Sequence, residues 1–331
     1  MHLTNNSIFS KTYRMKPKSA LENVTLVQLI DRFATDDIAR AHLESIRWEN
    51  GIVCPKCGCK EQRQFSTIAP NPEKKVRAGL RYCAECKSQF TVTIGTIFED
   101  THIPLRKWLI AWYLICSSKK GVSSLYLQRA LELGSYRSAL FMAHRIRYAL
   151  KDSIFTDKLS GTVEVDECFV SGAKESEVKP GRKRNLTPVV SMMERGGRVR
   201  SQVMPVISGN NLKQAIRENV EICSEVHTDC NHGYVGLEPK YSHHSVKHRA
   251  NEFIRKESER VVTTCSVEAF FSLLKRGVVG TFHHISPKYL PLYLAEFDHR
   301  HNFRKVSDGT RTDMGLRKVE GKRLMYQQPH E

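Results

Sequence analysis

The stretch Val163-Glu-Val-Asp-Glu167 decides the fold of this chain, because it predicts a strand that carries acidic side chains to its end. Valine alternates with acidic residues, a period of two that is typical of a half-buried strand. A second run of this kind, Glu225-Val-His-Thr-Asp229, also closes on an aspartate. The alternation places Glu164 and Asp166 on one face and Glu167 on the other. Both glutamates compete with Asp166 for the first position of an acidic site.

A third acidic side chain lies on a segment with helical periodicity. In Val267-Glu-Ala-Phe-Phe-Ser-Leu-Leu-Lys-Arg276 the apolar residues form one stripe, and Glu268 and Lys275 stand seven positions apart. Seven residues are nearly two turns at ~3.6 residues per turn, so the carboxylate and the ammonium group share one face.

Two strand-borne aspartates and a helix-borne glutamate suit a pair of magnesium ions. Mg²⁺ prefers hard oxygen ligands, and two ions about 4 Å apart can hold the attacking and leaving oxygens of a phosphodiester. We therefore predict that Asp166, Asp229 and Glu268 bind two catalytic Mg²⁺ ions, with Mn²⁺ as a possible substitute. Without cations the carboxylates would repel one another and titrate as a coupled set.

The basic residues near this site allow two interpretations. An ammonium group at Lys275 would contact the phosphate beside the scissile bond and stabilise developing charge. The alternative is a solvated helix end with a favourable dipole interaction, and Arg276 stays open between the two. The loop Gly181-Arg-Lys-Arg184 either follows a DNA backbone or is a charged turn.

The order of predicted elements indicates an α/β fold of the ribonuclease-H-like class. Three strands, a helix and a fourth strand put Asp166 on the first strand and Asp229 on the fourth, with Glu268 on a flanking helix. The predicted elements are strands over 162–207, a helix over 211–220, strands ending at 229 and covering 241–247, and helices over 265–278 and 287–300.

The composition of the chain limits which binding partners and which cellular location we expect. The 331 residues include 52 Lys and Arg against 35 Asp and Glu, a net charge of +17. This excess favours double-stranded DNA as partner, although a basic surface kept for solubility is the alternative. The first twenty residues lack an apolar signal region, and the longest apolar run, 108–116, falls short of the ~20 residues of a membrane span. We expect a soluble protein of the cytoplasm or nucleoid, or of the nucleus in a eukaryote, without a membrane partner.

Two cysteine knuckles predict a structural zinc ion. Cys54-Pro-Lys-Cys57 and Cys83-Ala-Glu-Cys86 are separated by 25 residues, and each can present two thiolates to one tetrahedral ion. A redox dithiol is the alternative, but paired knuckles at this spacing favour zinc. Cys59 is too close to Cys57 to ligate without strain.

Helical periodicity surrounds the cysteine segment. Two short helices are expected over 26–48, interrupted near Thr35-Asp-Asp37, which is a plausible N-cap cluster. Three more over 103–150, with Gly134-Ser135 before the last, fit a helix-turn-helix. The last helix carries Arg137, Arg145 and Arg147 and would suit a DNA groove, whereas a helical bundle with a solvated basic face would look alike. The expected DNA-binding residues are Arg137, Arg145, Arg147, Arg182, Lys183, Arg184, Lys275 and Arg276.

Over about residues 25 to 305 the chain resembles the DDE transposases of the bacterial insertion-sequence group (ISXO2-like), to which the eukaryotic Merlin transposases are related. These proteins carry an N-terminal zinc ribbon and a ribonuclease-H-like domain. The matching stretches are Arg47-Trp-Glu-Asn-Gly51 with Cys54-Pro-Lys-Cys57, Glu164-Val-Asp-Glu167, His227-Thr-Asp229, Val267 to Gly277, Gly280 to Lys288, and Tyr293 to Asp298.

The resemblance implies Asp166, Asp229 and Glu268 as the metal-binding triad, followed by Lys275. It also implies cut-and-paste DNA transposition, in which the ribbon and helices recognise element ends and a homodimer or larger assembly pairs them. One departure is Cys265, at a position three before the glutamate where relatives often have Asn. Two rivals remain: a non-catalytic zinc-ribbon DNA-binding protein derived from a transposase, and a stand-alone ribonuclease-H-like nuclease.

The expected domain organisation has five parts. They are a disordered N-terminus (1–24), a helical lead-in with the zinc ribbon (25–99), a helix-turn-helix-like DNA-binding segment (100–155), the catalytic domain (160–305) and a loose basic tail (306–331).

Overall fold

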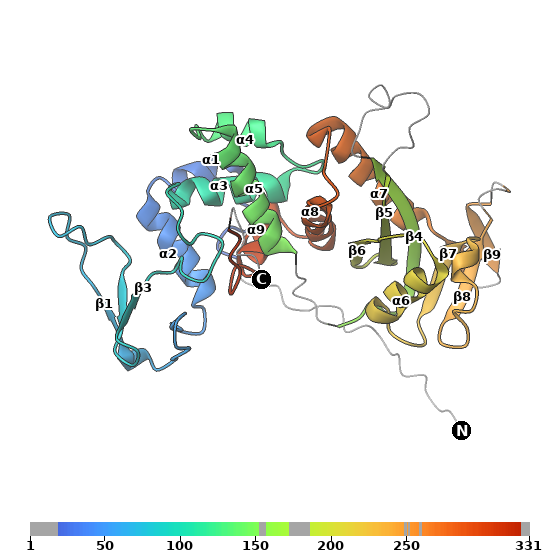
Figure 1. The fold of residues 1–331 in the computed structure, drawn as a ribbon, viewed down its shortest axis with the longest axis horizontal. Coiled ribbons are helices and arrows are strands. Elements are labelled where there is room, and N and C mark those ends of the chain that lie inside the picture. The colour runs from blue at the N-terminus through green and yellow to red at the C-terminus, as the bar shows by residue number, and fades with distance from the viewer. Residues whose placement is uncertain are drawn as a thin grey trace.

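A computed structural model describes residues 19–151, 157–171, 186–247, 250, 252–257 and 260–325. The chain forms a small β ribbon at one end, a group of helices in the middle and a five-stranded sheet at the other end (Figure 1). The expected DNA-binding residues Arg182, Lys183 and Arg184 lie outside the described residues, as does the N-terminus up to residue 18.

The helices of the N-terminal half begin where the sequence predicts. Thr35 caps the second helix, because its side chain accepts a hydrogen bond from the Ile38 N–H group, and Asp36 and Asp37 lie in the first turn. The helices pack into one apolar core that includes Trp108 and Trp112. Their bounds are α1 (Leu26–Arg32), α2 (Asp36–Arg47), α3 (Leu105–Ser117), α4 (Ser124–Ala130) and α5 (Tyr136–Leu150).

The ribbon is a three-stranded antiparallel sheet inserted between α2 and α3. Its strands are β1 (Phe65–Thr67), β2 (Arg81–Cys83) and β3 (Ser88–Phe90), in that order across the sheet. Its apolar cluster is small, with Cys54, Cys83 and Phe90 as the buried members. So small a core gives the ribbon little hydrophobic stabilisation of its own.

The large sheet has the strand order β6-β5-β4-β7-β8. The pairs β6–β5 and β5–β4 are antiparallel, whereas β4–β7 and β7–β8 are parallel. This is the order of a ribonuclease-H-like domain, as predicted, with the first strand in the centre. The strands are β4 (Thr162–Ser171), β5 (Leu186–Glu194), β6 (Val199–Val203), β7 (Glu225–Asp229) and β8 (Ser242–Val246).

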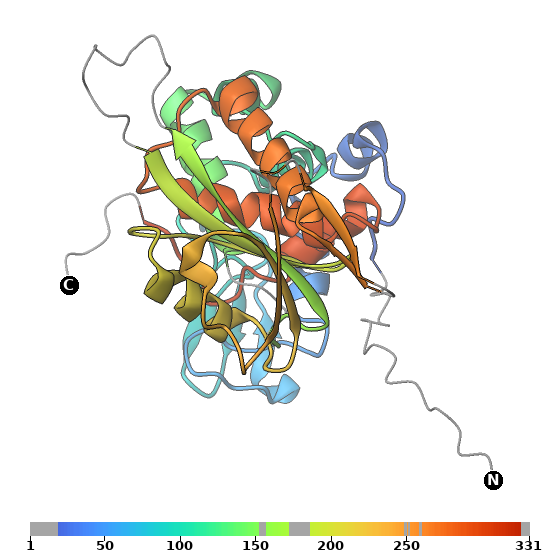
Figure 2. The ribbon, with the colours of Figure 1, turned by 90° about the vertical axis from the view of Figure 1, so that its right-hand side faces the viewer.

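Helices cover both faces of the sheet (Figure 2). Val163 and Val165 of β4 face α6 (Gly209–Asn219), and Cys168 and Val170 pack with α7 (Cys265–Gly277) and α8 (Leu290–Asn302). The alternation of side chains along a strand therefore assigns the acidic residues of β4 to opposite layers.

The structure corrects three expectations about the C-terminal half. A hairpin of β9 (Ile254–Glu257) and β10 (Arg260–Thr263) precedes α7, where no strand was predicted. The tail is not loose throughout, because α9 (Asp308–Leu316) packs against α3, and Arg311 there donates to the carbonyl of Cys116. The predicted domain boundary near residue 305 does not separate two cores. Ala295 and Leu316 lie on either side of it, and both belong to the N-terminal helical core. Arg311 is buried, although the sequence around it looks like a solvated basic tail.

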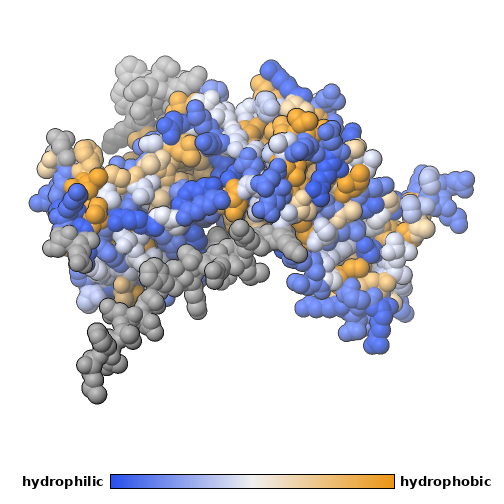
Figure 3. Space-filling view, turned by 180° about the vertical axis from the view of Figure 1, so that it is seen from behind, coloured by the Kyte–Doolittle hydropathy of each residue, from blue (hydrophilic) through white to orange (hydrophobic). Residues whose placement is uncertain are grey.

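The surface fits a protein that meets polar partners. On the side opposite to the view of Figure 1, hydrophilic residues dominate and the apolar patches are small and separate (Figure 3). No helix in the described part of the chain combines the length and apolar character needed to cross a bilayer.

Candidate functional site

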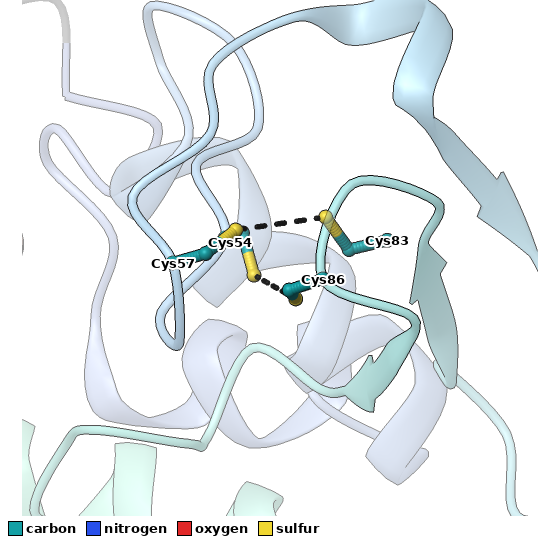
Figure 4. A group of neighbouring side chains, drawn as sticks. All are labelled: Cys54, Cys57, Cys83 and Cys86. Atoms are coloured by element: carbon teal, nitrogen blue, oxygen red, sulfur yellow. Dashed lines mark hydrogen bonds between the residues drawn. The ribbon is translucent and has the colours of Figure 1, made fainter.

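The four predicted zinc ligands converge on one point (Figure 4). The Sγ atoms of Cys54, Cys57, Cys83 and Cys86 all lie within 4.8 Å of one another. The Sγ–Sγ distance is 3.7 Å from Cys54 to Cys86 and 3.8 Å from Cys57 to Cys83. A tetrahedron with Zn–S bonds of about 2.3 Å requires sulfur atoms about 3.8 Å apart. The donor set and its spacing therefore fit a structural Zn²⁺ ion.

Cys59 has a different role, in agreement with its exclusion from the predicted ligands. Its carbonyl oxygen accepts a hydrogen bond of 2.9 Å from the Cys54 N–H group, which closes the first knuckle. Because four thiolates complete the tetrahedral shell, the zinc site has no position for substrate.

The two predicted catalytic aspartates come from adjacent parallel strands. Glu164 of β4 pairs with His227 of β7, so continuing this register places Asp166 beside Asp229 at the same edge of the sheet. Each carboxylate accepts a backbone N–H group, Asp166 from Glu167 at 2.8 Å and Asp229 from Asn231 at 2.9 Å. The parallel register thus brings together residues that are far apart in sequence.

The third predicted carboxylate, Glu268, lies in the first turn of α7. The Thr264 hydroxyl donates to its Oε1 atom at 2.9 Å, which fixes the side chain at the start of the helix. Cys265, the departure from the related sequences, starts α7 and has its Sγ atom 3.8 Å from the Phe253 carbonyl oxygen.

The charges of the other two predicted ligands act on Asp166. Burial raises the pKa of Asp166 to about 7, and the charges of Glu167, Asp229 and Glu268 raise this pKa too, against the Glu167 N–H group, which lowers it. Their oxygens are less tightly gathered than the thiolates: in the described residues, the cysteines alone bring three or more ligand atoms within 4.8 Å. Hard oxygen donors that repel one another are a set that divalent cations would stabilise.

Lys275 lies on the same side of α7 as the acidic site. It is exposed in the last turn of the helix. Its charge acts on Cys168, which stands two residues beyond Asp166 on the same face of β4. Arg276 is exposed as well. Both cations are thus accessible to a phosphate backbone.

Glu164, the first competitor for Asp166, faces a helix instead of solvent. Its side chain is 0% exposed and accepts hydrogen bonds from the Ser266 N–H group at 2.8 Å and the Val267 N–H group at 3.3 Å. Arg195 donates to it at 3.2 Å. Glu164 is therefore the partner of a helix N-terminus rather than an open metal ligand.

Glu167, the second competitor, faces the other layer. Asn231 donates to it at 2.5 Å, and the buried Tyr234 hydroxyl donates to its second oxygen. Burial raises the pKa of Glu167, and the charge of Asp229 raises it as well. Sequence reasoning missed Asn231, Tyr234 and Arg195, because a polar residue in a loop carries no signal about the strand it will meet.

The prediction that three arginines of α5 bind DNA is wrong for two of them. Arg145 and Arg147 of α5 are 6% and 0% exposed. Arg145 donates to the carbonyls of Glu99 and Leu324, and Arg147 donates to Glu296. Both guanidinium groups are hydrogen-bonded inside the protein, so these residues are not available to contact DNA. Arg137 is exposed in the first turn of α5, and its contact with DNA stays a prediction.

Comparison with known proteins gives the same two parts. Residues 158–302 match the ISXO2-like transposase domain, and residues 34–89 match the transposase zinc-ribbon domain. A protein of Halobacterium salinarum, the uncharacterized protein in transposable element ISH50, is 27% identical over 296 residues, which cover 83% of this chain and 94% of that protein. No solved structure matches the chain.

Proposed function

The chain belongs to the ISXO2-like transposases with an N-terminal zinc ribbon, and on this premise we propose that it cleaves and joins DNA by two-metal phosphodiester chemistry. The observation that supports the proposal is the parallel register that brings Asp166 beside Asp229, together with the charge of Glu268, which acts on Asp166. Burial raises the pKa of Asp166, and the charges of Asp229 and Glu268 raise it further, which is typical of a site that binds cations.

Asp166, Asp229 and Glu268 would hold two Mg²⁺ ions, which supply an activated water or 3′-hydroxyl and stabilise the leaving oxygen. Thr264 keeps Glu268 turned toward the site by its hydrogen bond. Lys275 binds the phosphate next to the scissile bond, and Arg276 adds charge along the backbone. The carboxylates would act only as metal ligands, so the proposed reaction requires no covalent intermediate with the protein.

The remaining parts of the chain bind and pair the DNA. The zinc ribbon and the exposed start of α5 recognise element ends, and two copies bring two ends together. The net charge of +17 supports a polyanionic partner.

The test is a cleavage and strand-transfer assay on DNA from the flanks of the gene, with Mg²⁺ or Mn²⁺. Cleavage at a defined end, lost in both Asp229→Asn and Glu268→Gln, is the expected result. Loss of one triad residue should lower the rate by a factor of at least about 10³, because charge stabilisation at the transition state is removed.

A matched control is Glu238→Gln, which removes an exposed carboxylate that pairs with His243. This variant should cleave at the wild-type rate. Zinc-dependent DNA binding by the wild-type protein with no metal-dependent cleavage would instead identify a non-catalytic DNA-binding protein.

A further inference from the structure

We propose that Glu164 and Glu167, the two glutamates on either side of Asp166, are positioning residues that bring the other triad members to it. Glu164 acts through α7, which carries Glu268, and Glu167 acts through the segment after β7, which follows Asp229. The inference rests on the proposed function of the triad. All three acidic residues of Val163–Glu167 then contribute to the site, Asp166 as a metal ligand and the two glutamates as positioning residues.

Glu164 supplies the N-terminal cap of α7 from another element. In this helix, the Thr264 hydroxyl at the N-cap donates to the side chain of Glu268 instead of capping a backbone N–H group of the first turn. The buried carboxylate of Glu164 takes that place, because it accepts the N–H groups of Ser266 and Val267 and the Ser266 hydroxyl at 3.1 Å. A negative charge at a helix N-terminus is favourable for the same reason as a local cap.

The geometry of this cap fixes Glu268 relative to Asp166. The capped residues Ser266 and Val267 immediately precede Glu268, and Glu164 stands two residues before Asp166 on the same face of β4. The cap therefore joins the two elements within two residues of a triad member on each side.

The charge of Glu164 is balanced within the protein. Arg195 donates to Glu164, to the carbonyl of Val261 at 2.8 Å and to His227 Nδ1 at 3.1 Å. His227 precedes Asp229 by two residues, and its Nδ1 atom accepts from the Arg195 guanidinium group. A buried carboxylate with these partners has its hydrogen-bonding capacity filled and is held in one orientation.

Glu167 does the same on the opposite layer. Asn231 links the two acidic residues, because its side chain donates to Glu167 while its backbone N–H group donates to Asp229. Tyr234, which is 0% exposed, holds the second oxygen of Glu167. The turn that follows Asp229 is thereby tied to β4 one residue beyond Asp166.

Metal binding tests this inference separately from catalysis. Mn²⁺ binding to the full-length zinc-loaded protein is measured by titration calorimetry for wild type, Glu164→Gln and Glu167→Gln. We expect each variant to bind Mn²⁺ about 10- to 100-fold more weakly, the usual effect of losing an outer partner of a metal ligand. Cleavage at saturating Mn²⁺ should recover in both variants, whereas Glu268→Gln, which lacks a ligand, should not recover.

Two further variants separate position from charge. Tyr234→Phe removes a partner of Glu167, and Ser266→Ala removes one partner of Glu164, and neither changes a charge. Both should weaken Mn²⁺ binding several-fold if orientation matters. The control Glu218→Gln removes an exposed carboxylate of α6 that accepts from Gln214, away from these contacts, and it should bind Mn²⁺ as wild type does.

Each outcome decides a specific point. Wild-type Mn²⁺ affinity in Tyr234→Phe overturns the role of Glu167, and wild-type affinity in Ser266→Ala together with Glu164→Gln overturns the role of Glu164. An equal loss in Glu218→Gln would reduce the effect to net charge and overturn both. If the wild-type protein itself bound no Mn²⁺ at the triad, the proposed function would fail, irrespective of the glutamates.

Discussion

Arg147 of α5 donates to Glu296 of α8 across 2.5 Å, and both side chains are completely buried. Arg300, one turn further along α8, donates to the other oxygen of the same carboxylate. The arrangement connects the helix expected to bind DNA to the helix that packs against the five-stranded sheet. The helical segment and the catalytic domain are therefore joined through a shared charged core.

This pairing predicts a large loss of stability for Glu296→Ala. Two buried guanidinium groups would lose their counter-charge, which costs about 3–5 kcal/mol in comparable sites. Urea unfolding followed by circular dichroism measures this loss. Glu61→Ala, which removes the partner of the exposed Arg63, should cost less than about 1 kcal/mol. Similar losses in both variants would show that burial of the pair does not matter.

Removal of zinc should unfold the ribbon and spare the sheet. The ribbon has a small apolar cluster, so metal binding supplies most of its folding free energy. Cys83→Ser or a strong chelator should expose amides 54–90 to rapid hydrogen exchange while β4 to β8 stay protected. Cys59→Ser should keep one zinc per chain and normal protection. Loss of zinc in Cys59→Ser would contradict the assigned ligand set.

The pKa of Asp166 predicts a pH dependence of both stability and metal affinity. Because this pKa is raised from 3.8 to about 7 in the folded protein, the folded state keeps a proton that the unfolded state releases. The stabilising contribution is complete below the unfolded pKa and is lost as the pH rises through about 7. Metal competes with the same proton, so Mn²⁺ should bind more tightly as the pH rises from 6 to 7.5.

Asp166→Asn isolates this contribution. Without metal, the variant should gain in melting temperature relative to wild type as the pH increases from 4 to 8, because it carries no charge to bury. Differential scanning calorimetry across this range provides the measurement. A melting-temperature difference that is independent of pH would contradict the raised pKa.

Lys275 is expected to act on the DNA phosphate and not on folding. Lys275→Ala should leave the melting temperature within about 1 °C of wild type, because the side chain is exposed at a helix end. DNA binding should weaken at all sequences, and the slope of log affinity against log salt should fall by about one. Fluorescence anisotropy at several salt concentrations measures this slope. Arg145→Lys, a change at a buried position, should leave the slope unchanged.

Prediction from sequence succeeded where a local pattern carries the information. The alternation in Val163–Glu167 marks a strand, Thr35 marks a helix start, and the cysteine knuckles mark a metal site, because each depends on neighbours within a few residues. The sequence also selected Asp166 over Glu164 and Glu167. In the structure Glu164 is hydrogen-bonded to α7 and Glu167 to Asn231 after β7, and Asp166 as a metal ligand stays a prediction.

Prediction failed where a charge depends on distant partners. In the sequence, a buried arginine looks the same as an arginine on a solvated basic face. Nothing near Arg145, Arg147 or Arg311 in sequence reveals the carboxylate and carbonyl groups that they meet.

The sequence by itself thus determined most of the elements, the cysteine ligands and the candidate triad, because periodicity and spacing are local properties of the chain. Only the tertiary structure decided which charges are exposed and which lie inside, and that Glu164 caps the helix that carries Glu268. The reason is physical: the stability and pKa of a buried charge depend on the partners that folding brings to it, and such partners are distant in sequence, 149 positions apart in the pair of Arg147 and Glu296.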